Sequence, residues 1–144
     1  MGQWTADQYR AALSDANYRC FAGMVDNQPV GHCILYDLQN PDNTVLLKRI
    51  VVYTKGKGYG RAALEAIKAY VFETRKANRL WLDVRAFNSR AQALYESVGF
   101  TYEGTLRRAS RVDGAYCDLK LYGMLREEYQ GVHRSGTETG NASF

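Results

Sequence analysis

Hydrophobic residues follow the two-residue period of β-strands in some stretches of the chain and the longer period of α-helices in others. Alternation or short apolar runs predict strands over Tyr18 to Asp26, Val30 to Leu38, Val45 to Tyr53, Leu80 to Ala86, Phe100 to Arg111 and Ala115 to Met124. The third stretch is an unbroken run rich in Val, Leu and Ile, which indicates a largely buried strand. We expect Asn27, Gln28 and Pro29 to turn the first hairpin, and Asp113-Gly114 to turn an antiparallel hairpin at the end of the sheet.

Other stretches have the apolar spacing of helices. Ala6 to Ser14 is predicted to be a short N-terminal helix. Arg61 to Lys76 places apolar residues on one face and charged residues on the other, which predicts an amphipathic helix packed on the sheet. A further helix begins where Ser89 and Gln92 have the spacing of a capping box, and Gly99 is placed to end it in the left-handed conformation.

The length of 144 residues suits one hydrophobic core and is too short for two ordinary domains. Strands combined with amphipathic helices therefore predict a single α/β domain over residues 1–130. Residues 131–144 are rich in Gly, Ser, Thr and Asn and lack periodicity, so we expect a flexible tail there.

Composition gives the broad class of the protein. Apolar residues make up 46% and charged residues 24%, as in soluble globular proteins. No apolar run approaches the roughly 20 residues of a membrane span, and Asp7 and Arg10 stand where a signal peptide would be apolar. We expect a cytoplasmic protein with no membrane partner. The cysteines Cys20, Cys33 and Cys117 lie far apart without a C-x-x-C pair, so we expect neither disulfides nor a bound metal.

The charge pattern narrows the class of binding partner. The net charge of +4 is modest, and the basic residues do not form one long run. This favours an anionic small molecule over a nucleic acid. Coenzyme A, with its diphosphate and 3′-phosphate, has matching charge.

A glycine-rich loop, Gly56 to Gly60, joins the third predicted strand to the next helix. Main-chain N–H groups at the start of a helix can hold a diphosphate, and Lys55, Lys57 and Arg61 add positive charge. A loop of this composition also serves as a plain connector, so the motif alone does not identify a ligand.

Two nucleotide-binding patterns are alternatives for this loop. Gly58, Gly60 and Ala63 fit the dinucleotide pattern G-x-G-x-x-A, and Asp83 follows at about the expected distance of 20 residues. However, residues 53–57 separate the strand from the first glycine, and the chain after Asp83 is too short to complete a doubly wound sheet with a substrate domain. A dinucleotide-binding protein stays a remote alternative. A P-loop is excluded because the sequence G-x-x-x-x-G-K-[ST] does not occur.

Two longer motifs lie in register. KGKGYG at 55–60 fits the pattern [QR]-x-x-G-x-[GA], with Lys55 as a conservative departure, and NSRAQALYESVGF at 88–100 fits N-x-x-A-x-x-L-Y-E-x-x-G-F. In this order and at this distance they resemble the GNAT superfamily of N-acetyltransferases over residues 48–100. The stretches EGTLR at 103–107 and DGAYCD at 113–118 are similar to the branch that acetylates ribosomal-protein and other N-termini, diamines and some antibiotics.

The resemblance implies a fold and an activity. The fold is a mixed, mostly antiparallel central sheet with flanking helices, here shortened at the N-terminus, because this family usually opens with a strand and two helices. The activity is transfer of the acetyl group of acetyl-CoA to a primary amine by direct attack, with CoA as product; the acceptor is a small molecule or a peptide N-terminus. A catalytically silent acyl-CoA binding module is the alternative, since part of the acceptor-site wall is missing or supplied otherwise. The protein is expected to be a monomer or a homodimer.

The resemblance also implies site residues. Two strands splay apart, and the pantetheine arm bonds to main-chain groups near Ile50, Val51 and Val52. The diphosphate lies on the loop and the helix start. The expected cofactor-binding residues in this second group are Lys55, Gly56, Lys57, Gly58, Tyr59, Gly60, Arg61 and Asn88, the last of which is equally a plain helix cap.

Tyr95 corresponds to the general acid of the family, which protonates or hydrogen-bonds the departing thiolate. By spacing alone, Tyr95 belongs to the apolar stripe of its helix and would be a core residue. Asp83 and Glu103 are candidates for a base that acts through water, and each also suits an ordinary surface or paired carboxylate. His32 and His133 carry no motif.

Overall fold

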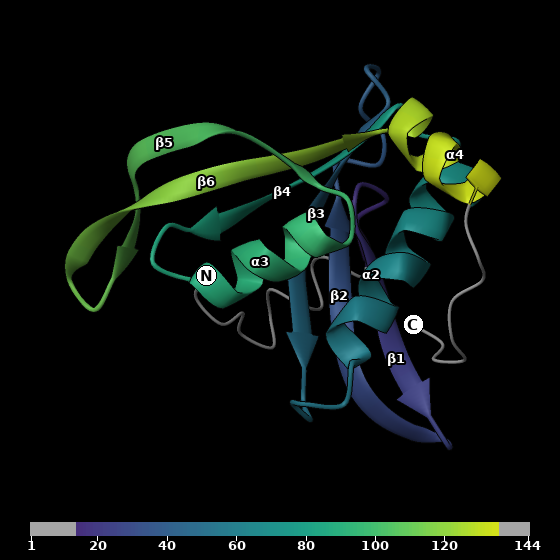
Figure 1. Ribbon diagram of the computed structural model, residues 1–144, viewed down its shortest axis with the longest axis horizontal. Coiled ribbons are helices and arrows are strands. Elements are labelled where there is room, and N and C mark those ends of the chain that lie inside the picture. Colours follow the sequence, from purple (N-terminus) through teal and green to yellow (C-terminus); the bar gives the residue numbers. More distant parts are fainter. Residues whose placement is uncertain (1–13, 136–144) are drawn as a thin grey trace.

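A mixed sheet of six strands organises the chain, of which the computed structural model describes residues 14–135, with side chains up to residue 131. The strands are β1 (Arg19–Val25), β2 (Gln28–Tyr36), β3 (Thr44–Val52), β4 (Arg79–Arg85), β5 (Thr101–Val112) and β6 (Ala115–Leu125). They lie in the order β1-β2-β3-β4-β6-β5 (Figure 1). Neighbouring strands pair antiparallel, except that β3 and β4 are parallel.

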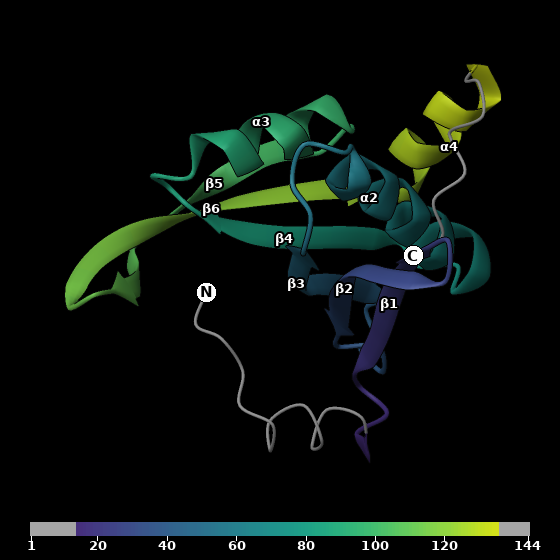
Figure 2. The same cartoon turned by 90° about the horizontal axis from the view of Figure 1, so that it is seen from below.

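The helices are α2 (Tyr59–Ala69), its π-helical continuation η1 (Tyr70–Thr74), α3 (Ser89–Ser97) and α4 (Arg126–Ser135). Helices α2 and α3 lie on the same face of the sheet (Figure 2). The predicted mixed, mostly antiparallel sheet with flanking helices is confirmed. A sheet with one parallel pair is not doubly wound, so the dinucleotide-binding alternative is wrong.

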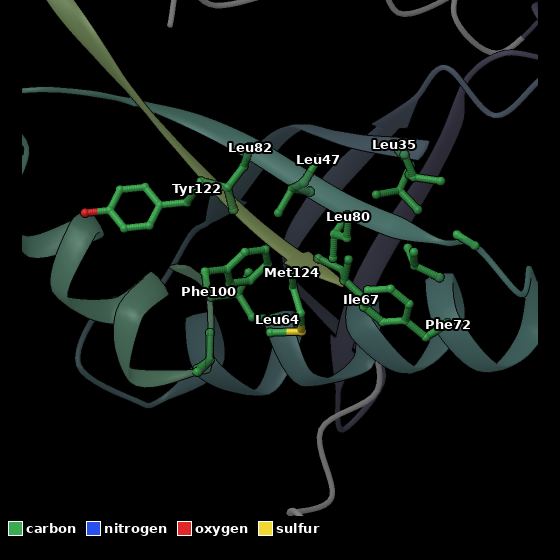
Figure 3. Close-up of a cluster of buried hydrophobic side chains, with 14 of the residues drawn as sticks. Leu35, Leu47, Leu64, Ile67, Phe72, Leu80, Leu82, Phe100, Tyr122 and Met124 are labelled. Atoms are coloured by element: carbon green, nitrogen blue, oxygen red, sulfur yellow. The ribbon is translucent and has the colours of Figure 1, made fainter. Parts of the chain in front are cut away.

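The hydrophobic core lies between α2 and the sheet. Leu64 and Ile67 of α2 pack toward Leu80 and Leu82 of β4, with Phe100 and Met124 closing the cluster (Figure 3). Alternation along β4 places Leu80, Leu82 and Val84 in this core, so the side chains between them point to the opposite face. The core thus fixes β4 with one face toward the helices, and the residues of its other face are partly buried.

The two hairpins with predicted turns, β1–β2 and β5–β6, each turn through two residues with positive φ. The predicted Asp113-Gly114 turn is confirmed, with φ of 51° and 81°. The first hairpin turns at Asp26 and Asn27, with φ of 50° and 65°, so the predicted turn at Asn27, Gln28 and Pro29 is wrong by one residue. Aspartate and asparagine tolerate this left-handed backbone, which a two-residue turn requires at both positions.

Helix α3 begins one residue earlier than a capping box at Ser89 requires. The Asn88 side chain is the cap, and its Oδ1 accepts a hydrogen bond from the Ala91 amide at 3.1 Å. Gln92 instead donates from its side chain to the main-chain carbonyls of Arg85 and Ala86. Gly99 follows the helix with φ of 103°, as predicted, and a Cβ there would lie 3.1 Å from the Met124 side chain.

The helix predicted over Arg61 to Lys76 starts at Tyr59 and ends in a π-turn. Lys76 then adopts a left-handed φ of 58°, which stops helical hydrogen bonding. The predicted helix Ala6 to Ser14 lies, apart from its last residue, outside the described residues. Helix α4 was not predicted, and it extends through residues 131–135, where the sequence indicates a tail. Along residues 14–135, no helix has the length and apolar content of a membrane span.

Candidate functional site

Strands β3 and β4 are parallel neighbours that pair only where they begin. Residues 44–46 pair with residues 79–81, and beyond them the described strands have no further partners in common. β3 then continues with β1 and β2, while β4 turns away with β6 and β5 (Figure 1). The sheet is therefore open along the second half of β3.

A β-bulge in β3 lies at the point of divergence. Ile34 of β2 faces Arg49, whereas Leu35 faces Leu47, so Lys48 is an extra residue without an opposite partner. Bulges bend a strand and increase its local twist. We attribute the divergence of β3 from β4 to this bend.

Along β3, the main-chain N–H and C=O groups of successive residues point alternately toward β2 and toward the gap. The Tyr53 amide donates to the Val30 carbonyl at 2.8 Å, so this pair is hydrogen-bonded. In an antiparallel ladder every second pair is bonded, which makes Val51 the next residue bonded to β2. The N–H and C=O groups of Ile50 and Val52 therefore point toward the gap that β4 has left.

The gap holds a hollow of about 400 Å³. Its walls come from both splayed strands, from the start of α3 and from the β5–β6 hairpin: Leu46, Lys48, Ile50, Asp83, Val84, Arg85, Phe87, Asn88, Tyr95, Ser110 and Leu119. Val84 belongs to the helix-side face of β4, and Asp83 and Arg85 belong to the opposite face. The hollow consequently reaches both faces of the sheet.

A second hollow of about 450 Å³ lies over the glycine loop. Its lining is Val52, Thr54, Lys55, Gly56, Gly58, Tyr59, Gly60, Arg61, Asn88, Arg90, Ala91 and Leu94. Asn88 lines both hollows, so they adjoin at the start of α3. The predicted loop residues are thus brought together with the predicted Asn88.

The loop conformation leaves amides at the start of α2 open. Gly58 caps α2 with φ of 75°, no side chain caps the helix, and no acidic residue lies in its first turn. A Cβ on Gly58 would meet nothing within 4 Å, whereas one on Gly60 would lie 3.4 Å from the Leu94 side chain. Gly58 therefore keeps the approach to the helix start clear, and Gly60 allows α2 and α3 to approach closely. An uncapped, positively charged helix start favours anions.

Tyr95 projects from α3 into the hollow between the strands. Its ring lies 6.1 Å from that of Phe100 and 6.3 Å from that of Tyr122, so the core role inferred from spacing is present as well. Burial, and next the charge of Asp83, raise the pKa of Tyr95 to about 12. Among the described residues the Tyr95 hydroxyl has no hydrogen-bond partner. It is a protonated donor that faces the hollow.

The structure separates the two candidate bases. Asp83 lines the hollow with Tyr95; burial raises its pKa, against the opposing charges of Lys48 and Arg85. Glu103 forms an ion pair with Arg79 outside both hollows, and hydrogen bonding from that guanidinium lowers the pKa of Glu103. Glu103 is a paired carboxylate, and Asp83 is the carboxylate at the site.

Two cations of α2 hold α3 in place, although α3 has no fully buried residue among its own. Lys68 is only 4% exposed, and its ammonium donates to the Val98 carbonyl at the end of α3 at 2.8 Å. Arg61 donates to the Ser97 hydroxyl at 2.7 Å. A cation at a helix C-terminus stabilises that helix. These bonds fix the helix that carries Tyr95.

The structure places most of the predicted cofactor residues at the two hollows. Ile50 lines the gap, and Lys57 and Val51 line neither hollow. Sequence reasoning missed Lys48, Arg85 and Phe87 as wall residues; the bulge that exposes Lys48 has no sequence signature. It also missed Thr54, Arg90, Ala91 and Leu94 as lining of the loop hollow, although the last three lie inside the second motif.

Comparison with known proteins yields a family match. The model of the acetyltransferase (GNAT) family matches residues 2–100. An uncharacterized N-acetyltransferase of a Bacillus subtilis prophage is 28% identical over 134 residues, which are 92% of this chain and 73% of that protein. The ribosomal protein bS18 alanine N-acetyltransferase of Salmonella typhimurium is 52% identical over 52 residues, or 36% of this chain and 34% of that enzyme.

Solved structures agree on the fold. A variant of spermidine N-acetyltransferase from Vibrio cholerae superimposes with a TM-score of 0.80 at 25% identity, covering 90% of this chain and 76% of that one. The curated spermidine N(1)-acetyltransferase of the same organism is 32% identical over 75 residues, or 43% of its length. The ribosomal-protein and spermidine acetyltransferases are thus each matched over less than half of their own length.

The Lys68 contact gives a test of how α3 is held. Replacing Lys68 by Met should lower the free energy of unfolding by about 1–3 kcal/mol, because the buried Val98 carbonyl loses its donor and Glu65 loses its ion-pair partner. Lys76→Met is the matched control, since Lys76 is exposed, and it should change stability by less than about 0.5 kcal/mol. Urea denaturation of both variants measures the difference. Equal stability of the two variants would show that the bond does not hold α3.

Proposed function

The chain belongs to the acetyltransferase (GNAT) family of acetyl-CoA-dependent N-acetyltransferases, and we propose that its two adjoining hollows are the cofactor and acceptor sites of such an enzyme. One observation supports this proposal most strongly. The uncapped, glycine-lined start of α2 adjoins a gap between β3 and β4 that is lined by unpaired main-chain groups. A phosphorylated carrier with an amide-containing arm matches both features.

The loop hollow suits the diphosphate of coenzyme A. The open amides at the start of α2 provide hydrogen bonds, and Lys55 and Arg61 provide charge at the lining. The arm of the cofactor then passes Asn88 and bonds to the main-chain groups of Ile50 and Val52, as an added strand would. Val51 has its main-chain groups turned toward β2, so we assign it no bond to the cofactor. Lys57 contributes long-range charge only.

Acetyl-CoA supplies the activated acetyl group and leaves as CoA. The acceptor nitrogen forms a bond to the thioester carbon, the carbon–sulfur bond breaks, and the sulfur leaves as a thiolate. A main-chain N–H of β3 that faces the gap stabilises the oxygen as it becomes negative. The acceptor reacts as its neutral amine, having lost its first proton to solvent. Asp83 receives, directly or through water, the proton that the nitrogen loses after it has bonded to the carbon. Holding both reactants in one gap provides much of the rate enhancement.

Tyr95 hydrogen-bonds the departing thiolate. Its pKa of about 12 lies above the value of about 8.5 for a thiol, so complete proton transfer would be uphill by about 5 kcal/mol. A hydrogen bond to the charged sulfur avoids that cost. The proton that finally neutralises CoA comes from water.

The acceptor is a primary amine. Relatives include one named for a ribosomal-protein alanine and others named for spermidine, so a peptide N-terminus and a small amine are the proposed classes. A cytoplasmic location and a monomeric or homodimeric state remain predictions of the sequence.

An assay with a thiol reagent tests the proposal directly. Purified protein should release CoA from acetyl-CoA in the presence of an amine from a panel of peptides, polyamines and aminoglycosides. Thermal stabilisation by CoA without turnover on any amine would favour the silent binding module. Neither stabilisation nor turnover would contradict the proposal altogether.

A pair of substitutions at Gly58 tests the anion site. Gly58→Asp and Gly58→Asn have similar size and tolerance of positive φ, but only aspartate brings negative charge to the helix start. We expect the aspartate variant to have a KM for acetyl-CoA at least about tenfold above that of the asparagine variant. Steady-state kinetics at fixed amine concentration measure this ratio. Equal KM values would place the diphosphate elsewhere.

Removing the hydroxyl of Tyr95 separates chemistry from packing. Tyr95→Phe keeps the ring among Phe100 and Tyr122, so stability should change by less than about 1 kcal/mol. The value of kcat should fall by at least about tenfold, while the KM for acetyl-CoA stays within about twofold. An unchanged kcat in an assay limited by chemistry would exclude the hydroxyl from the reaction.

A further inference from the structure

The acceptor side of the gap has an unusual balance of charge for an amine-binding site. Asp83 is the only carboxylate in the lining of this hollow as the described residues form it, and the cations Lys48 and Arg85 line it too. Both cations act on the ionisation of Asp83, which places their charges within electrostatic reach of it. An ammonium group that approaches Asp83 therefore also meets two positive charges.

The three charged side chains lie on the sheet face away from α2 and α3. Asp83 and Arg85 alternate with the core residues Leu82 and Val84 of β4. Lys48 lies over the Tyr36 ring at 5.4 Å, and Tyr36 neighbours the buried Leu35 in β2, so this ring also points to the far face. The hollow over the glycine loop lies between α2 and α3, and these charges lie on the opposite face of the sheet.

Arg85 is anchored rather than loose. Its Nε donates to the Ser110 hydroxyl of β5 at 3.2 Å. Within the described residues no other hydrogen bond of its guanidinium is present, which leaves the terminal nitrogens for a ligand. A guanidinium held in this way binds carboxylates in a fork.

We infer that the acceptor is an amine that carries a carboxylate a few bonds from its nitrogen, as in an amino acid or a peptide that begins next to an acidic residue, and not a polyamine. This inference rests on the proposed function. Asp83 receives the ammonium, and the guanidinium of Arg85 receives the carboxylate, with the positive charge of Lys48 nearby. Leu46, Leu119 and Phe87, which is 64% exposed, provide apolar contact for the rest of the acceptor. A polyamine would bring its second ammonium against the two cations.

Matched tripeptide amides test this charge preference. Ala-Glu-Ala and Ala-Gln-Ala amides, and Ala-Lys-Ala amide with its lysine side chain trimethylated, each offer a single acceptor amine and differ in the charge beside it. Free alanine and spermidine are further acceptors. We expect kcat/KM to fall from the glutamate to the lysine peptide by at least about tenfold, with spermidine below the neutral peptide. A kcat/KM for free alanine above that for the glutamate peptide would identify an amino acid as the source of the carboxylate. The opposite order would identify a peptide.

Charge reversal locates the origin of that preference. Lys48→Glu and Arg85→Glu should each reduce the glutamate-to-lysine ratio at least about fivefold, and Lys76→Glu, an exposed control on the loop before β4, should leave it unchanged. The ratio within one preparation does not depend on the fraction of active enzyme. A wild-type preference for lysine or spermidine, or a ratio unmoved by both reversals, overturns the inference. Stabilisation by CoA with no turnover on any acceptor contradicts the proposed function itself.

Discussion

The site depends on one constraint: β3 stops forming hydrogen bonds with β4 after its first residues. A buried main-chain group without a partner costs free energy, so strand pairing normally continues along the full length of two neighbours. Here the ladder stops after residues 44–46. The bulge at Lys48 bends β3 away, and the groups of Ile50 and Val52 are left for a ligand or for water. In the proposed function, an extended, amide-containing molecule would restore the missing ladder, and the gap would be selective for such a molecule.

Helix α3 joins this gap to the glycine loop. Its first residue is set by the Asn88 cap, whose position lets one side chain line both hollows. Its end is held by Lys68 and Arg61 of α2. Because Arg61 also lines the hollow over the glycine loop, the segment proposed to hold the phosphates is bonded to the helix that carries Tyr95. The same contacts therefore fix α3 against α2 and set the distance between the glycine loop and the Tyr95 hydroxyl.

Sequence patterns reveal the parts of this site whose chemistry is local. The glycine loop, the helix that follows it and the motif containing Asn88 and Tyr95 each depend on neighbours within one turn or one loop, so they are visible in the sequence. The bulge at Lys48 depends on the register between β2 and β3, which no single strand encodes. The sequence also does not show which carboxylate is paired. Asp83 and Glu103 are similar candidates in the sequence, and only the contact of Glu103 with Arg79 distinguishes them. The start of α3 is set by a local contact, because the Asn88 side chain accepts a hydrogen bond from the Ala91 amide and is therefore the cap in place of Ser89.

Amide hydrogen exchange, followed residue by residue with and without CoA, tests the central claim most directly. In the free protein the amides of Val51 and Tyr53 should be protected by β2, while those of Ile50 and Val52 exchange faster. Saturating CoA should slow exchange at Ile50 and Val52 by at least about tenfold and should affect Val51 less. Protection of Ile50 and Val52 that is already complete in the free protein, or that CoA does not change, would contradict the account of the open strand.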